Sequence, residues 1–412
     1  MPRRFLGESG IVQKDIFIVF TLLVNAVAWY FMTLMIIDSI LSILNVSHAQ
    51  NIIIWAAYHV AIIGSGIVGS ILSKEIDRLQ FIYLWIILGV VTSSLPVLLS
   101  DFTVLHVLII GILLGASLGL GMPSCLAYFA DCTHVENRGL TSGIILLITN
   151  LSAAFFVILF GMFNLTVNLI IFVVWRASAL ITFFLKPEQR IVSERKKNPS
   201  FTSILHDKSF VLYFIAWLMF CLIDRFETPI QKNFLGDSYN LILIVGPLLG
   251  SLSAFVGGLL ADRIGRKRIV LYGFVSMGIA YALIGITAAP VVSWFLSLSV
   301  LSISAGIVWV IFIFILWGDL SKFVTSEKYY AIGIIPFFFT NIVQLFSAEY
   351  VTEIPVTSAF SLAAFFLFLA VLPLLYAPET LPQKKIELRR LRKYVDGVKK
   401  VREKYEEKGV KG

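Results

Sequence analysis

The chain has 412 residues, of which 58% are hydrophobic and 14% are charged, and its mean hydropathy is +0.90. Soluble domains are about half apolar, and this chain has too few polar residues to cover a water-soluble globule. The composition therefore predicts an integral membrane protein. Its formal net charge of +8 is spread over short connections and one tail, and this excludes nucleic acid as a partner, because a nucleic-acid-binding domain presents one basic face.

Apolar runs that are long enough to cross a lipid bilayer, about 20 residues each, follow one another along the chain. Six lie in the first half, at Ile16–Leu44, Asn51–Ser73, Phe81–Leu99, Thr103–Ala130, Leu140–Phe163 and Leu165–Leu185. Six more follow a polar stretch, at Ser209–Ile230, Leu241–Ala261, Ile269–Ala288, Val291–Trp317, Ala331–Tyr350 and Val356–Tyr376. The runs predict an all-α integral membrane protein with about twelve transmembrane helices.

Lysine and arginine residues gather in alternate connections between these runs. They are Arg3, Arg4 and Lys14; Lys74 and Arg78; Arg138; Lys186, Arg190, Arg195, Lys196, Lys197 and Lys208; Arg263, Arg266, Lys267 and Arg268; Lys322 and Lys328. Because positive residues are retained in the cytoplasm, the pattern predicts a cell-membrane protein with both termini cytoplasmic. The tail, Lys384 to Lys411, has apolar residues at helical spacing and fits either a helix on an anionic inner leaflet or a solvated helix.

Five residue pairs recur between the two sets of runs at offsets of 188 to 191 residues. They are Gly69 and Gly258, Asp131 and Asp319, Glu136 and Glu327, Gly143 and Gly333, and Pro187 and Pro378. Six crossings are an even number, so the halves keep one orientation and are related by a pseudo-two-fold axis along the membrane normal. We expect two six-helix bundles (1–185 and 209–380), a cytoplasmic linker (186–208) and a basic cytoplasmic tail (381–412).

The connection after the eighth run carries the most specific motif, Gly257-Gly-Leu-Leu-Ala-Asp262-Arg-Ile-Gly265-Arg-Lys-Arg268. It resembles the loop signature of the major facilitator superfamily, Gly-x-Leu-Ala-Asp-Arg-x-Gly-Arg-Arg/Lys. Glu136-Asn-Arg138-Gly139 and Pro378-Glu379-Thr380-Leu381 are weaker matches to the same family. The resemblance covers residues 16 to about 381. It implies the fold of that family, with the first, second, fourth and fifth helices of each half around a central cavity.

The resemblance also implies a cytoplasmic gate, formed by Gly258, Asp262, Arg263, Gly265, Arg266, Asp319, Glu136 and Arg138. Asp262 is expected to meet the positive end of the eleventh helix, near Ala331, with Arg266 paired to Asp319. A basic loop that acts only as a topology signal is the alternative. In the first half, Ser73 and Ile76 stand where the family has an acid and a second glycine. That half of the gate is therefore expected to be weakened or altered.

Polar residues inside apolar helices are candidates for function, because they are costly in a membrane. For substrate binding we expect Arg225 and two pairs that are 191 residues apart, namely Thr149 with Asn150 and Thr340 with Asn341. Both pairs lie about 9–15 Å into their helices. Hydrogen bonds between helices are the alternative for these residues.

Carboxylates on the first and seventh helices are candidates for proton coupling or for an outer gate. They are Asp38, Asp224 and Glu227, and Arg225 and Pro229 lie beside the last two. A hydrated rim is the alternative. Arg176 and His59 are single ionisable residues within the sixth and second helices, for which snorkelling or a structural role is the more typical explanation.

The leading prediction is a secondary active or facilitative transporter that moves one small solute by alternating access, with proton-coupled symport as one form. A transporter-like sensor or scaffold, which binds a ligand without translocating it, is the rival. A drug/proton antiporter is a further alternative, although the fifth helix lacks the Gly-Pro-rich signature of such exporters. The expected partners are the lipid bilayer, the solute and protons. We expect a monomer that needs no cofactor or metal and is not an enzyme.

Overall fold

The computed structural model describes residues 13–99, 101–185, 197–286, 291–321 and 324–382, together with residue 395. Residues 1–12, part of the predicted linker (186–196) and nearly all of the predicted basic tail lie outside the described residues. Among the residues described, twelve helical segments are long and apolar enough to cross a membrane. The predicted all-α membrane protein with about twelve spans is confirmed.

The first half contains six spans. Short helices extend two of them: η1 (Leu95–Leu98) continues the third span and α7 (Ile181–Phe184) continues the sixth. The main helices are α1 (Gln13–Leu44), α2 (His48–Leu72), α3 (Arg78–Ser94), α4 (Val104–Cys132), α5 (Arg138–Met162) and α6 (Leu165–Ser178).

The second half starts with the short helix α8 (Phe201–Leu205) and again contains six spans. Its uninterrupted spans are α9 (Lys208–Leu235), α10 (Tyr239–Ile264), α11 (Arg266–Ile286) and α16 (Val356–Tyr376); only η3 (Gly236–Ser238) separates α9 from α10. The tenth span runs from α12 (Val291–Val310) through the π-helical η4 (Ile311–Ile315) into α13 (Leu316–Leu320). The eleventh consists of α14 (Glu327–Gly333) and α15 (Ile335–Val351).

Local chemistry sets several of these boundaries. Ser47 begins α2 with a capping box, in which its side chain accepts the Gln50 N–H and Gln50 accepts the Ser47 N–H. The eleventh span is interrupted next to Pro336, which has no N–H to donate into a helix. This span begins at Glu327 and not at the predicted Ala331, because the residues from Glu327 onward already form a helical turn ahead of the apolar run.

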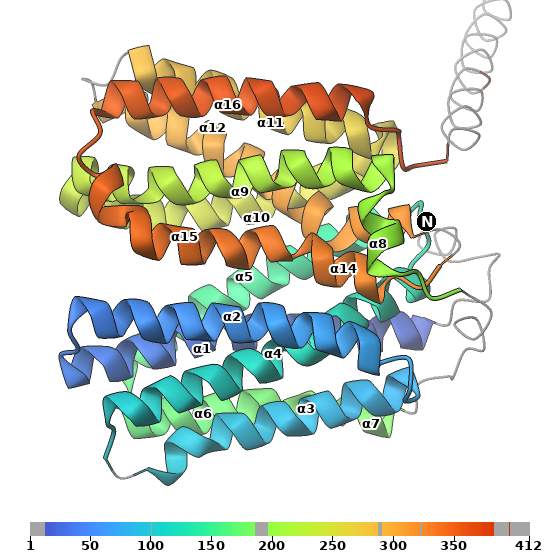
Figure 1. The fold of residues 1–412 in the computed structure, drawn as a ribbon, viewed down its shortest axis with the longest axis vertical. Helices are drawn as coiled ribbons and strands as arrows, with labels where there is room; N and C mark the ends of the chain where they lie inside the picture. Colours follow the sequence, from blue (N-terminus) through green and yellow to red (C-terminus); the bar gives the residue numbers. More distant parts are fainter. Residues whose placement is uncertain are drawn as a thin grey trace, which may run out of the picture.

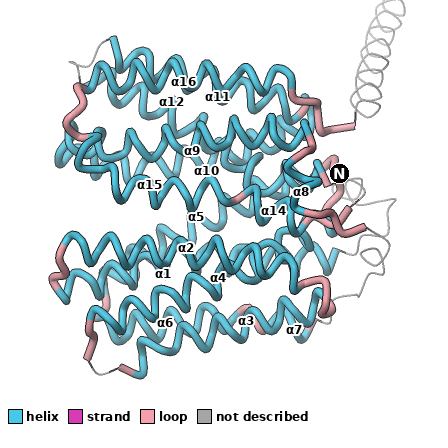
Figure 2. The backbone as a smooth tube through the Cα atoms, in the orientation of Figure 1, coloured by secondary structure: helices cyan, strands magenta, loops and turns pink. Residues whose placement is uncertain are grey.

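Figure 1 shows the two halves as separate groups of helices, with α5 and α14 lying between them. Across the interface α5 packs along α10, and α2 packs along α14 and α15. Figure 2 shows that the spans run side by side as helices. The described chain begins and ends at the same end of this bundle (Figure 1), as an even number of crossings requires. We call it the basic end, because the basic connections of the sequence lie there.

Candidate functional site

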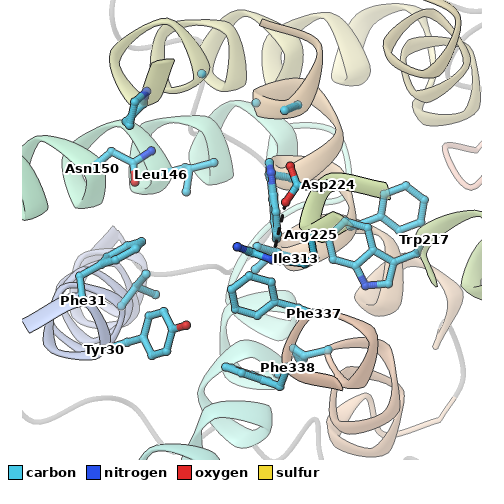
Figure 3. Close-up of a pocket in the computed structure, with 18 of the residues that line it drawn as sticks. Tyr30, Phe31, Leu146, Asn150, Trp217, Asp224, Arg225, Ile313, Phe337 and Phe338 are labelled. Carbon is cyan, nitrogen blue, oxygen red and sulfur yellow. Dashed lines mark ion pairs between the residues drawn. The ribbon is translucent and has the colours of Figure 1, made fainter. Parts of the chain in front are cut away.

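A cavity of about 450 Å³ lies between the two halves. It is lined from the first half by α1, α2, α4 and α5, and from the second by α9, α10, α11, the tenth span and the eleventh span. Figure 3 shows side chains from both halves facing this space, with Tyr30 and Phe31 on one side and Arg225 and Phe337 on the other. The volume falls within the range of about 300–1,000 Å³ that is typical of small-molecule sites.

The charged groups of the cavity wall, among the described residues, all come from α9. They are Asp224, Arg225 and Glu227. The Nε of Arg225 lies 3.7 Å from Oδ2 of Asp224, and its guanidinium carbon lies 5.3 Å from the ring centre of Phe337. Glu227 is only 8% exposed, and its Oε2 has no hydrogen-bond partner among the described residues.

Of the two predicted Thr-Asn pairs, only Asn150 lines the cavity, where its amide donates to Oγ of Ser251 over 2.8 Å. Thr149 is fully buried outside the cavity wall, because adjacent residues point about 100° apart around a helix. Thr340 and Asn341 instead donate to the Phe337 carbonyl, over 3.2 and 3.1 Å. The two pairs were expected to present hydrogen-bond groups to the solute from both halves, and in this structure only Asn150 of the first half does so.

Three other predicted candidates also lie away from the cavity wall. Asp38 is exposed near the end of α1. His59 is buried, with Nδ1 2.7 Å from the carbonyl oxygen of Trp55. Arg176 is completely buried between Trp29 and Trp85, whose ring centres lie 4.5 and 4.3 Å from its guanidinium carbon. These surroundings fit the structural explanation for His59 and Arg176.

Replacing Arg176 by methionine is expected to leave the melting temperature unchanged or to raise it. The guanidinium has one hydrogen bond, to Asn25, while its Nε and Nη2 are buried without partners. Replacing a buried ion pair by apolar groups of similar volume is often neutral or stabilising by about 1–4 kcal/mol, and a buried cation without an ion-pair partner has less to offset its desolvation. Asn25→Ala is expected to lower the melting temperature, because it leaves the cation without that partner. A large loss of stability in the methionine variant would contradict this interpretation.

Sequence reasoning missed the aromatic wall of the cavity. It includes Tyr30, Phe31, Trp217, Trp309, Phe337 and Phe338. The rings of Tyr30 and Phe338 lie 5.9 Å apart across the two halves. It also missed the π-helical turn, which contributes Phe312, Ile313 and Phe314. An apolar run such as Ile311–Ile315 carries no signal that separates a cavity wall from a lipid-facing surface.

At the basic end, the carboxylate of Asp262 binds the N-terminus of α5. Its Oδ1 accepts the Gly139 N–H over 2.9 Å and its Oδ2 accepts the Leu140 N–H over 2.8 Å. A carboxylate at this position is favoured by the unsatisfied N–H groups and the helix dipole. The prediction that Asp262 meets the eleventh helix was wrong. The reason is that α10, which carries Asp262, packs along α5, whereas the eleventh span packs along α2.

Asp319 joins both halves in a buried ion cluster. It pairs with Arg266 of its own half, from Nε to Oδ2 over 3.1 Å, and with Arg138 of the first half. Arg266 also pairs with Asp262 over 2.9 Å, and it donates to the Val135 carbonyl of the first half. The predicted pairing of Arg266 with Asp319 is confirmed. Of the other predicted gate residues, Arg263 is exposed and Glu136 is half-buried.

The first-half counterpart of this cluster is built differently. Arg78 pairs with Asp131 over 2.6 Å, as Arg266 pairs with Asp319 at an offset of 188 residues. Ser73 provides no carboxylate here, and the acid that crosses the interface is Glu327 of α14, which pairs with Arg78. In these two ion pairs across the interface, the acids are Asp319 and Glu327, and both lie in the second half. This is an alteration of the kind that Ser73 led us to expect.

Gly265 and Glu379 hold the start of α11 in place. Gly265 has a φ of +123°, a conformation that side chains rarely allow. Glu379, from the weaker motif at the end of the chain's last span, accepts the N–H groups of Arg266 and Lys267 over 2.9 and 3.3 Å. In the first half, Ile76 replaces the glycine, and Asp77 caps α3 from within the loop by accepting two N–H groups.

Glycines allow α5 and α10 to touch at the basic end. A Cβ on Gly139 would lie 2.2 Å from the carbonyl oxygen of Gly258, which is backbone and has no room to yield. Gly139→Ala is expected to separate the two helices and to reduce solute uptake, since overpacking costs about 1–3 kcal/mol. Gly161→Ala on the same helix is the control, because nothing lies within 4 Å of its Cβ position. Equal uptake by both variants would contradict the expectation.

Comparisons with known proteins agree with this architecture. The family model of the Major Facilitator Superfamily matches residues 18–320. No curated protein matches the chain.

Two solved structures are similar in fold. The human organic anion transporter MFSD10 (TETRAN) has a TM-score of 0.70 at 14% identity, covering 89% of this chain and 100% of that one. The proton:xylose symporter XylE bound to 6-bromo-6-deoxy-D-glucose has a TM-score of 0.66 at 14% identity, covering 89% and 96%. At such low identity the likeness shows the fold alone.

Proposed function

The chain belongs to the major facilitator superfamily and is a multi-pass membrane transporter, not an enzyme, and we propose that it carries one small solute by alternating access, coupled to protons. The observation that carries the proposal is the cavity between the halves, in which the charged groups of the described wall come from one helix, α9. Alternating access needs contacts that exist in one state only. In this proposal, the ion pair of Arg138 with Asp319 across the interface at the basic end is one of these contacts and breaks when that end opens.

Proton coupling is assigned to Glu227, with Asp224 as its neighbour. A coupling group must change its surroundings between states, because only then does its proton affinity change. Glu227 faces the cavity and is nearly buried with an unpartnered oxygen. Asp224 already has a counter-ion in Arg225. Asp38 is exposed outside the cavity wall, so we do not retain it as a coupling group.

Solute contacts are assigned to Asn150 and Arg225, which reach the cavity from opposite halves. Thr149, Thr340 and Asn341 act in this proposal as packing residues. We further propose that the basic end faces the cytoplasm in the cell membrane, that residues 1–185 and 209–380 are the two moving bundles, and that one chain transports alone.

The test is uptake of labelled solutes into proteoliposomes. Sugars, amino acids, organic anions and organic cations are offered in turn, with a pH gradient of either sign and with none. One class is expected to accumulate against its own gradient only when a pH gradient is present, and the sign separates symport from antiport. Uptake that ignores the pH gradient would overturn the coupling. A solute that stabilises the protein against heat without crossing would favour the rival sensor or scaffold.

A further inference from the structure

The cavity wall contains one carboxyl group, that of Glu227, that forms no ion pair with a described residue. Arg225 is paired with Asp224, at 3.7 Å, so these two charges compensate each other. Glu227 has the neutral Gln231 as a side-chain hydrogen-bond partner, and its Oε2 is buried without any partner. With both carboxyl groups ionised, the three charged side chains sum to one negative charge. An isolated buried carboxylate is strongly unfavourable unless a counter-charge reaches it.

Other parts of the wall of the same cavity are aromatic and come from both halves. Tyr30 and Phe31 of α1 lie opposite Phe337 and Phe338 of α15 (Figure 3). Aromatic faces attract cations, by about 0.5–2 kcal/mol depending on desolvation. The guanidinium of Arg225, 5.3 Å from the ring centre of Phe337, shows that a cation is accommodated against this wall.

From these observations we propose that the transported solute is an organic cation with an apolar body, and that its cationic centre pairs with Glu227. The apolar body would fill the aromatic part of the cavity, which at about 450 Å³ has the size of a small-molecule site. An organic anion would face Glu227, while Arg225 is already paired with Asp224. In this inference Arg225 contacts the apolar body of the solute and does not bind its charged centre. The inference rests on the proposed transport function and specifies its solute.

Coupling follows from the same carboxylate. A proton and an organic cation both neutralise Glu227, so the two compete for one group. The proposal therefore implies that the transporter exchanges the cation for a proton. Protons that cross the membrane down their gradient drive the cation across in the opposite direction. This outcome corresponds to antiport and not to symport.

The binding test uses two ions of nearly equal size and shape and opposite charge, tetraphenylphosphonium and tetraphenylborate. Their affinity is measured by thermal stabilisation of the purified protein in detergent, with an unrelated membrane protein as the blank. The phosphonium is expected to bind at least about tenfold more tightly, a difference of about 1.4 kcal/mol. Equal binding, or preference for the borate, would overturn the proposal even if no variant folds.

Variants then locate the charge. Glu227→Gln keeps the size of the side chain and is expected to weaken phosphonium binding at least about tenfold. Asp38→Asn removes a carboxylate of the same protein outside the cavity wall and is expected to leave binding unchanged. Unchanged binding by Glu227→Gln, or an equal loss in both variants, would overturn the assignment to Glu227.

The two proposals fail in different ways. Gradient-driven uptake of a sugar or an organic anion, with no binding of the phosphonium, would remove the cation inference and keep the transport function. Binding of the phosphonium that depends on Glu227, without flux of any cation into proteoliposomes, would remove the transport function and keep the cation site.

Discussion

Asp262→Asn is expected to lower solute uptake at least about tenfold, while the protein still inserts and remains folded. The carboxylate accepts two backbone N–H groups of α5 and pairs with Arg266. An asparagine turns its NH₂ group toward one of those N–H groups, so one charge-assisted bond is lost. Such bonds are worth about 1.5–3 kcal/mol. The closed arrangement of the basic end loses this amount, and a transporter that cannot close one end completes fewer cycles.

Proteoliposome uptake and gel filtration of the purified variant measure the two parts of this expectation. Arg263→Gln is the matched control, since its side chain is adjacent in sequence but exposed. If Asp262→Asn transports at the wild-type rate, the contact at the N-terminus of α5 does not limit the cycle, and the loop acts as a topology signal only.

Glu227→Gln is expected to abolish accumulation driven by a pH gradient, whichever sign of gradient drives the wild type. The amide has the same shape and takes up no proton in the working range, so the coupled step is lost while the cavity keeps its form. Asp224→Asn is expected to have a different effect, because it frees Arg225 from its pair and places an unpaired cation in the cavity.

The measurement compares uptake with and without the gradient for wild type, Glu227→Gln and Asp38→Asn. Asp38→Asn should retain full gradient-driven accumulation, since that carboxylate is exposed and outside the cavity wall. Full accumulation by Glu227→Gln would exclude Glu227 as the coupling group. If Asp224→Asn also retains full accumulation, neither carboxylate of α9 in the cavity wall is the coupling group.

The sequence by itself determined the spans, their number and the duplication of the halves. A helix that crosses lipid must be about 20 residues long and apolar, so composition along the chain reports it directly. The loop with Asp262 and Gly265 is also a local signal, because capping and a positive φ demand particular residues at fixed positions. The offset of 188 residues between Asp131 and Asp319 was also visible in the sequence, and the structure shows that each of these acids pairs with an arginine of its own half, Arg78 or Arg266.

Only the tertiary structure decided which face each helix turns to its neighbours. It separated Asn150, in the cavity wall, from the adjacent Thr149, and it gave Asp262 the N-terminus of α5 as its partner. The aromatic wall was invisible in the sequence for the same reason. In a membrane both the lipid and the protein interior are apolar, so hydrophobic periodicity does not mark the buried face as it does in water. The rotation of each helix, and therefore the content of the cavity, follows from packing between segments far apart in the chain.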